Sequence, residues 1–159
     1  MGLVVNVLRR TIQLVIIVMF AVLIATVFYQ VLGRYLFNAP PSWSEELARF
    51  LQVWIALLAS ALCIQQGMHL GVDYLAHALP ARWRARLEIL VHVLVSGFLV
   101  LLLAQGTKIL DVAAVQSSPA MGINMWYAYL AVPVGAALML LESVLKLGQA
   151  LRAPGRPTT

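Results

Sequence analysis

The chain has 159 residues, of which 62% are hydrophobic and 11% are charged, and its mean hydropathy is +0.91. Soluble domains contain about 45–50% apolar and about 25% charged residues, so this composition excludes an ordinary soluble domain. The formal charge of +5 comes from basic residues at the ends of apolar runs. This placement argues against nucleic acid as a partner and for anchoring in membrane lipids.

Four apolar runs follow one another along the chain. Residues 11–33 and 50–68 contain no charge, and weaker runs cover 89–107 and 125–141. Each approaches the roughly 20 residues that a helix needs to cross hydrocarbon, and none alternates as a β-barrel strand does. We predict an all-α membrane protein with one domain at 1–147. Its transmembrane helices lie at about 11–35, 44–66, 84–108 and 125–146, and a disordered cytoplasmic tail follows at 148–159.

The first run follows Arg9 and Arg10, as the apolar part of a secretory signal would. It is too long for a signal, and no small-residue cleavage site follows it, so we expect an uncleaved first span. Arg34 ends the span at a depth from which its long side chain can reach the interface. A simple end anchor is the favoured interpretation of Arg34.

The second span begins after two prolines at positions 40 and 41. The spacing of Ser42 and Glu45 fits a capping box, which predicts a helix that starts near Trp43. Glu45 and Glu46 then precede Arg49 by four and three residues, so both can reach it on one helical face. Because three charges are costly at mid-membrane, we place this turn at the periplasmic interface, with Trp43 as an aromatic anchor. A partner contact and a solvated helix start both remain open.

The connection between the second and third spans contains two glycines, at positions 67 and 71, that favour a break in the helix. A short interfacial helix is expected at 73–79. The next helix begins at Pro80, and its cytoplasmic anchors are Arg82, Trp83, Arg84 and Arg86.

The distribution of lysine and arginine predicts the orientation. With both termini on one side, that side holds Arg9, Arg10, Arg82, Arg84, Arg86, Lys146, Arg152 and Arg156, and the other holds Arg34, Arg49 and Lys108. The positive-inside rule places both termini in the cytoplasm. Residues 117–122 then form a periplasmic turn, Trp126 anchors the fourth span, and Pro133 predicts a kink within it.

Few residues suggest a catalytic, transport or cofactor-binding role. No charged group lies deep in the first or second span, or in the fourth before Glu142, so the chain is a poor candidate for a carrier by itself. His69 and His92 can approach each other at the cytoplasmic side, which leaves a haem-bearing anchor subunit of a redox complex as an alternative. Cys63 is the single cysteine and excludes an intrachain disulfide. We expect no catalytic residues, no metal site and no enzyme activity.

Three short blocks of sequence, in this order along the chain, resemble those of a known family. Residues 30–38 (QVLGRYLFN), 43–49 (WSEELAR) and 67–73 (GMHLGVD) resemble the small membrane subunit, DctQ-like, of tripartite ATP-independent periplasmic (TRAP) transporters. Residues 118–123 with Trp126, and 131–135, are similar to the last connection and fourth span of that family. Glutamines at 65 and 66 and Asn124 depart from its common pattern, where basic residues and a proline often stand.

The resemblance implies a non-catalytic subunit of the bacterial inner membrane that binds neither substrate nor cofactor. Its partners would be a large polytopic subunit, which holds the substrate and sodium sites, and a periplasmic solute-binding protein. The complex would import organic anions, the small subunit would brace the elevator-type large subunit, and a phospholipid could fill their interface. The partner-facing or fold-fixing residues would be Arg34, Trp43, Glu45, Glu46, Arg49, His69 and Asp73.

Overall fold

The computed structural model describes residues 3–38, 41–66 and 81–152. They form five helices, α1 (Leu3–Leu36), α2 (Ser42–Gln66), α4 (Ala81–Ala113), α5 (Trp126–Tyr129) and α6 (Ala131–Arg152). Four segments are long and apolar enough to cross a membrane: Val5–Leu36, Ser42–Gln66, Ile89–Ala113 and Trp126–Gly148. The predicted all-α fold with four transmembrane helices is confirmed. The interfacial helix expected at 73–79 lies outside the described residues.

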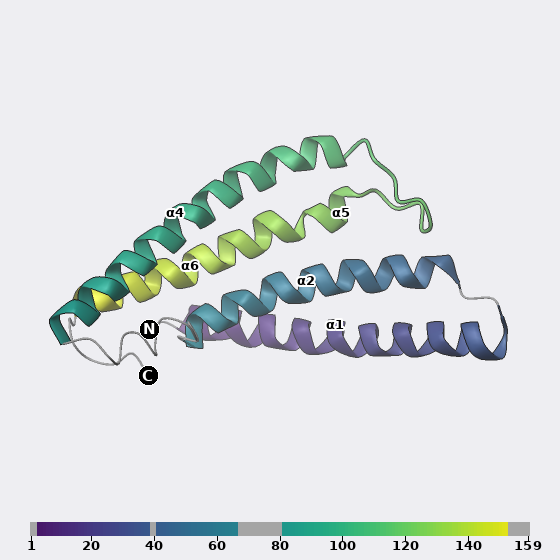
Figure 1. Ribbon diagram of the computed structural model, residues 1–159, viewed down its shortest axis with the longest axis horizontal. Helices are drawn as coiled ribbons and strands as arrows, with labels where there is room; N and C mark the ends of the chain where they lie inside the picture. Colours follow the sequence, from purple (N-terminus) through teal and green to yellow (C-terminus); the bar gives the residue numbers. More distant parts are fainter. Residues whose placement is uncertain (1–2, 39–40, 67–80, 153–159) are drawn as a thin grey trace.

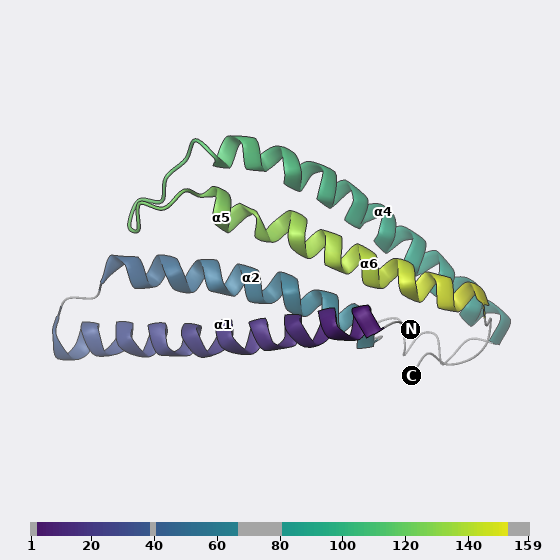
Figure 2. The same ribbon diagram turned by 180° about the vertical axis from the view of Figure 1, so that it is seen from behind.

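The four long helices lie side by side in the order α1, α2, α6, α4 (Figure 1), and the view from behind shows the same order (Figure 2). Among the described helices, α1 packs only on α2, whereas α6 packs on both α2 and α4. The first residues of α1 and the last of α6 lie at one end of the bundle, here called the termini end (Figure 1). The opposite end, called the loop end, holds the connection from α1 to α2 and the 114–125 connection.

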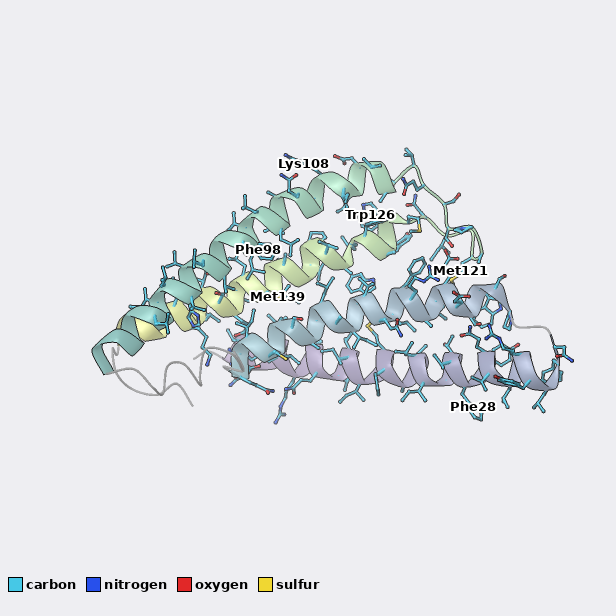
Figure 3. All side chains as sticks on the ribbon, in the orientation of Figure 1. Phe28, Phe98, Lys108, Met121, Trp126 and Met139 are labelled. Carbon is cyan, nitrogen blue, oxygen red and sulfur yellow. The ribbon has the colours of Figure 1, made fainter. Side chains whose placement is uncertain are left out.

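Small residues let α6 approach its two neighbours closely. A Cβ atom added to Gly135 would meet the Cβ atom of Leu57 on α2 at 2.7 Å, and one added to Gly106 on α4 would meet a methyl group of Val132 at 3.1 Å. The core that follows consists of Ala61, Leu99 and Met139, one from each of three helices. Met139 is labelled in Figure 3, where α6 lies between α2 and α4.

The ends of the helices have local causes. Asn38 adopts a left-handed conformation with φ 51° just after α1, which asparagine tolerates better than most residues. Helix α2 begins at Ser42, one residue before the predicted start, and the hydroxyl of Ser44 donates a hydrogen bond to the Pro41 carbonyl at 2.7 Å. In the part of the chain that the structure describes, Glu45 pairs with Arg49, so the predicted capping box with Ser42 was wrong.

The kink predicted at Pro133 appears as an interruption of one residue between α5 and α6, where Leu130 keeps helical dihedral angles, φ −58° and ψ −24°. Pro133 has no N–H group for the carbonyl of Tyr129, four residues earlier. The chain is therefore interrupted at Leu130, between α5 and α6, and Pro133 lies in the first turn of α6. Pro133 itself is buried against Gly106 of α4.

Candidate functional site

The charged turn at the start of α2 divides its two carboxylates between different partners. Glu45 binds Arg49, with Oε1 and the guanidinium nitrogen 2.8 Å apart, and both side chains are more than 60% exposed. Exposed pairs of this kind contribute about 0.3–0.5 kcal/mol. The expectation that both carboxylates share Arg49 was therefore right for Glu45. The carboxylate of Glu46 instead forms hydrogen bonds with backbone amides.

Glu46 fastens the 114–125 connection to α2. One oxygen of its carboxylate accepts hydrogen bonds from the backbone amides of Ala120 and Met121, at 3.1 and 3.0 Å. The Met121 amide also lies 3.2 Å from the hydroxyl oxygen of Ser118. Figure 3 shows Met121 beside the first turns of α2. Glu46 is thus joined at the loop end to two residues that follow it by 74 and 75 positions in the sequence.

The 114–125 connection has an ordered structure of its own. Ser117 and Asn124 form an antiparallel bridge, and the amide of Ser118 donates to the carbonyl of Ile123 at 2.8 Å. Gly122 takes a φ of +66°, a left-handed value that closes the predicted turn. Asn124 donates to the Ala114 carbonyl at 2.7 Å and accepts from the Trp126 amide at 2.8 Å. Asn124 therefore links the residue that follows α4 to the start of α5.

Aromatic residues join neighbouring helices. Trp43 stacks on Tyr29 of α1, with ring centroids 5.9 Å apart, so it fixes the first helix to the second. Trp126 meets Tyr127 edge to face at 5.4 Å. Trp54, for which the sequence predicts no particular role, donates from its indole nitrogen to the carbonyl of Tyr127 at 3.2 Å. Trp54 thereby joins α2 to α5.

An ion pair that the sequence did not predict joins two helices at the termini end. The guanidinium of Arg9 donates to both carboxylate oxygens of Glu142, from Nε at 2.8 Å and from a terminal nitrogen at 2.6 Å. The side chains are 15% and 7% exposed. This bidentate pair connects α1 to α6, which otherwise do not pack on each other. The available signal was a carboxylate inside the predicted fourth span, at the same end as two N-terminal arginines.

A second buried polar contact lies beside this pair. Ser143 on α6 is 1% exposed, and its hydroxyl lies 2.9 Å from that of Ser96 on α4. His92, one turn before Ser96, is also buried. These groups would be costly in hydrocarbon without partners, so the paired hydroxyls hold α4 and α6 in register.

The remaining predicted residues are distributed as follows. Arg34 is exposed in the last turn of α1. The positions 82, 83, 84 and 86 belong to the first turns of α4, and their side chains lie beyond what the structure describes. His69 and Asp73 also lie outside the described residues. Within the described ranges, no three His, Cys, Asp or Glu residues gather as metal ligands would.

Comparison with known proteins gives one family. Residues 23–153 match the model of the DctQ component of tripartite ATP-independent periplasmic transporters. The chain is 30% identical over 128 residues to the sialic acid TRAP transporter permease protein SiaT of Haemophilus influenzae, with 80% of this chain and 20% of SiaT covered. It is 25% identical over 135 residues to the small permease protein SiaQ of Vibrio cholerae, with 85% and 78% covered.

The chain covers a third relative to nearly the same extent as it covers SiaT. The chain is 30% identical over 135 residues to the isethionate TRAP transporter permease protein DctMQ of Oleidesulfovibrio alaskensis, with 82% of this chain and 21% of DctMQ covered. The chain therefore spans about a fifth of SiaT and of DctMQ, and most of SiaQ. The names describe permease proteins, and none of the three describes a haem-bearing redox anchor.

Proposed function

The chain belongs to the DctQ component family of TRAP transporters, as a small permease subunit with several membrane spans in the inner membrane, and we propose that it is the scaffold of its transporter. In this role it has no catalytic activity. It braces a large, moving membrane subunit, and its own helices keep their relative positions while the partner changes conformation.

The observation that carries the proposal is that polar contacts tie the helices together at both ends. Glu46 fastens the 114–125 connection to α2 at the loop end. Arg9 and Glu142 join α1 to α6 at the termini end. The one carboxylate that is buried in the described residues, Glu142, is thus already bound to an arginine. A rigid brace needs such internally satisfied charges, whereas a carrier needs a buried charge that it can offer to a substrate or ion.

Several finer features are proposed together with this role. The termini end faces the cytoplasm and the loop end the periplasm, as the positive-inside rule favours. The partners are a large permease subunit, a periplasmic solute-binding protein and membrane lipids, and a phospholipid occupies part of the interface. Transport is coupled to sodium bound in the large subunit. The solute is an organic anion, since the names of the relatives specify sialic acid and isethionate.

Co-expression with the two proposed protein partners tests this function. The tagged chain should purify with the large subunit as a colourless, stoichiometric complex. Reconstituted in liposomes with an inward sodium gradient, the complex should take up labelled sialic acid, isethionate or a C4-dicarboxylate only with its binding protein. Uptake by the chain alone, or a haem spectrum in the purified sample, would contradict the proposal.

A further inference from the structure

Helix α2 exposes one face along its whole length. From its first turn onward its exposed residues recur every three or four positions, so they share one side of the helix. The opposite side packs on α1 and α6. Apart from Trp43, which is exposed on another side of the helix, the exposed residues are Ser42, Glu45, Arg49, Gln52, Val53, Ala56, Cys63 and Gln66. We call this set, together with half-buried Ser60, the α2 stripe.

The composition of the α2 stripe differs from that of the other exposed helix surfaces. Val53, at 43% exposure, is its one large apolar residue. Helices α1 and α4 instead expose many large aliphatic and aromatic side chains, such as Ile17 at 68% and Leu101 at 64%. Each of these two helices interrupts that surface with an exposed glutamine, at positions 13 and 105. Large apolar side chains suit lipid tails, and the α2 stripe offers few of them.

The α2 stripe has properties of a surface that contacts another membrane protein. Ala56, Ser60 and Cys63 follow one another at spacings of four and three, and small residues at such spacings let a second helix approach closely. The amide of Gln52 makes no hydrogen bond within the described residues. A polar group of a neighbouring protein could pair with this amide, but the glutamines at positions 13 and 105 are exposed in the same way, so the small residues and the few large apolar side chains distinguish this surface.

The length of the α2 stripe agrees with such a contact. At about 1.5 Å per residue, Glu45 and Cys63 are about 27 Å apart along the axis, close to the roughly 30 Å of the hydrocarbon core. The exposed pair of Glu45 and Arg49 lies at the loop end of this surface. A partner helix could therefore lie along α2 from one membrane interface to the other.

The relatives indicate what this partner is. In SiaT and DctMQ the matching segment makes up about a fifth of a longer permease polypeptide. In each of these permeases a segment like this one is therefore covalently joined to a much longer remainder, which makes the large permease subunit the partner that we choose for this surface. Resting on the proposed function, we propose that the α2 stripe is the surface through which this chain packs on a membrane helix of the large permease subunit.

Site-specific photo-crosslinking in the assembled complex tests the assignment. A benzophenone amino acid is introduced at Gln52 or Cys63 in the α2 stripe, and at Ile17 or Leu101 as matched controls on the lipid-facing surfaces. The chain is co-expressed with the large subunit, and adducts are separated by mass after irradiation. We expect adducts with the large subunit from positions 52 and 63, and at least tenfold less from 17 and 101.

Other outcomes would overturn the inference. A complex that forms but gives adducts only from Ile17 or Leu101, or from no position, would place the interface elsewhere and leave the scaffold role intact. Adducts of twice the mass of this chain would make the α2 stripe a contact between two copies. If the unmodified chain does not purify with the large subunit, the proposed function fails, and this inference fails with it.

To separate local disruption from a wrong assignment, the bulky variant Ala56→Phe is compared with Ile17→Phe. Each enlarges one exposed side chain on one helix. We expect Ala56→Phe to reduce recovery of the large subunit at least fivefold, while the purified chain keeps its own size-exclusion profile. Ile17→Phe should leave recovery unchanged. Equal recovery with both variants would contradict the inference.

Discussion

The pairing of Arg9 with Glu142 predicts an asymmetric response to mutation. Glu142 is 7% exposed and has a short side chain, whereas Arg9 is 15% exposed and has a long one. Arg9 also lies about 9 Å from the first residue of α1, close enough to the helix end for its guanidinium to reach the interface. Removing Arg9 therefore leaves a buried carboxylate without a charged partner, whereas removing Glu142 leaves an arginine that can move toward water.

The expected magnitudes follow from this difference. Arg9→Gln should lower the free energy of unfolding by about 3–5 kcal/mol, the range for breaking a buried ion pair by removing one partner. Glu142→Gln should cost about 1–3 kcal/mol, the range for lost hydrogen bonds to a charged group. The double variant should lose less free energy of unfolding than the two single variants lose together, because neither charge is left without its partner. Arg10→Gln, which changes an exposed neighbour, is the matched control and should have little effect.

Unfolding in mixed micelles of mild detergent and dodecyl sulfate, followed by tryptophan fluorescence, measures these free energies. Hydrogen bonds between membrane helices average about 0.6 kcal/mol in double-mutant cycles. A coupling energy at or below that value would show that the pair is no stronger than a neutral contact. A larger loss from Glu142→Gln than from Arg9→Gln would refute the argument from burial and side-chain length.

Two further predictions concern the loop end and the packing of α6. Glu46→Gln removes the charge that the amides of the 114–125 connection contact, so their hydrogen exchange should become roughly threefold to tenfold faster; Glu45→Gln is the control, and mass spectrometry that finds equal rates in both variants would contradict the role of Glu46. Gly135→Val should lower the free energy of unfolding by about 1–3 kcal/mol through overpacking against Leu57. Gly97→Val, where a Cβ atom meets nothing within 4 Å, should cost about 1 kcal/mol or less, and similar losses in both variants would rule out a specific close approach at Gly135.

Several features could be predicted because local sequence determines them. Charge-free runs, turn residues and the positions of prolines indicated the helices, the turn at 117–122 and the interruption near Pro133. The exact response at Pro133 was not predicted, since a proline can either bend a helix or interrupt it for a single residue. The choice depends on the neighbouring helix, and here Pro133 packs against Gly106 of α4.

The partners of the polar residues could not be predicted in the same way. Helical spacing allowed Glu45 and Glu46 to share Arg49, and nothing in the sequence indicated that the 114–125 connection would fold back to Glu46. The pairing of Arg9 with Glu142 depends on how α1, α2 and α6 lie relative to one another. Sequence position gave only the end of the bundle at which each residue would lie.

The sequence by itself thus determined that this protein lies in a membrane, how many spans it has and to which family it belongs. Each of these depends on residue type and order along the chain. The tertiary structure alone decided which polar groups satisfy one another and which helix face remains without an internal partner. These depend on which helices are neighbours and at what rotation. In a membrane the hydrophobic effect does little to select neighbours, so close packing and a few polar contacts must do so.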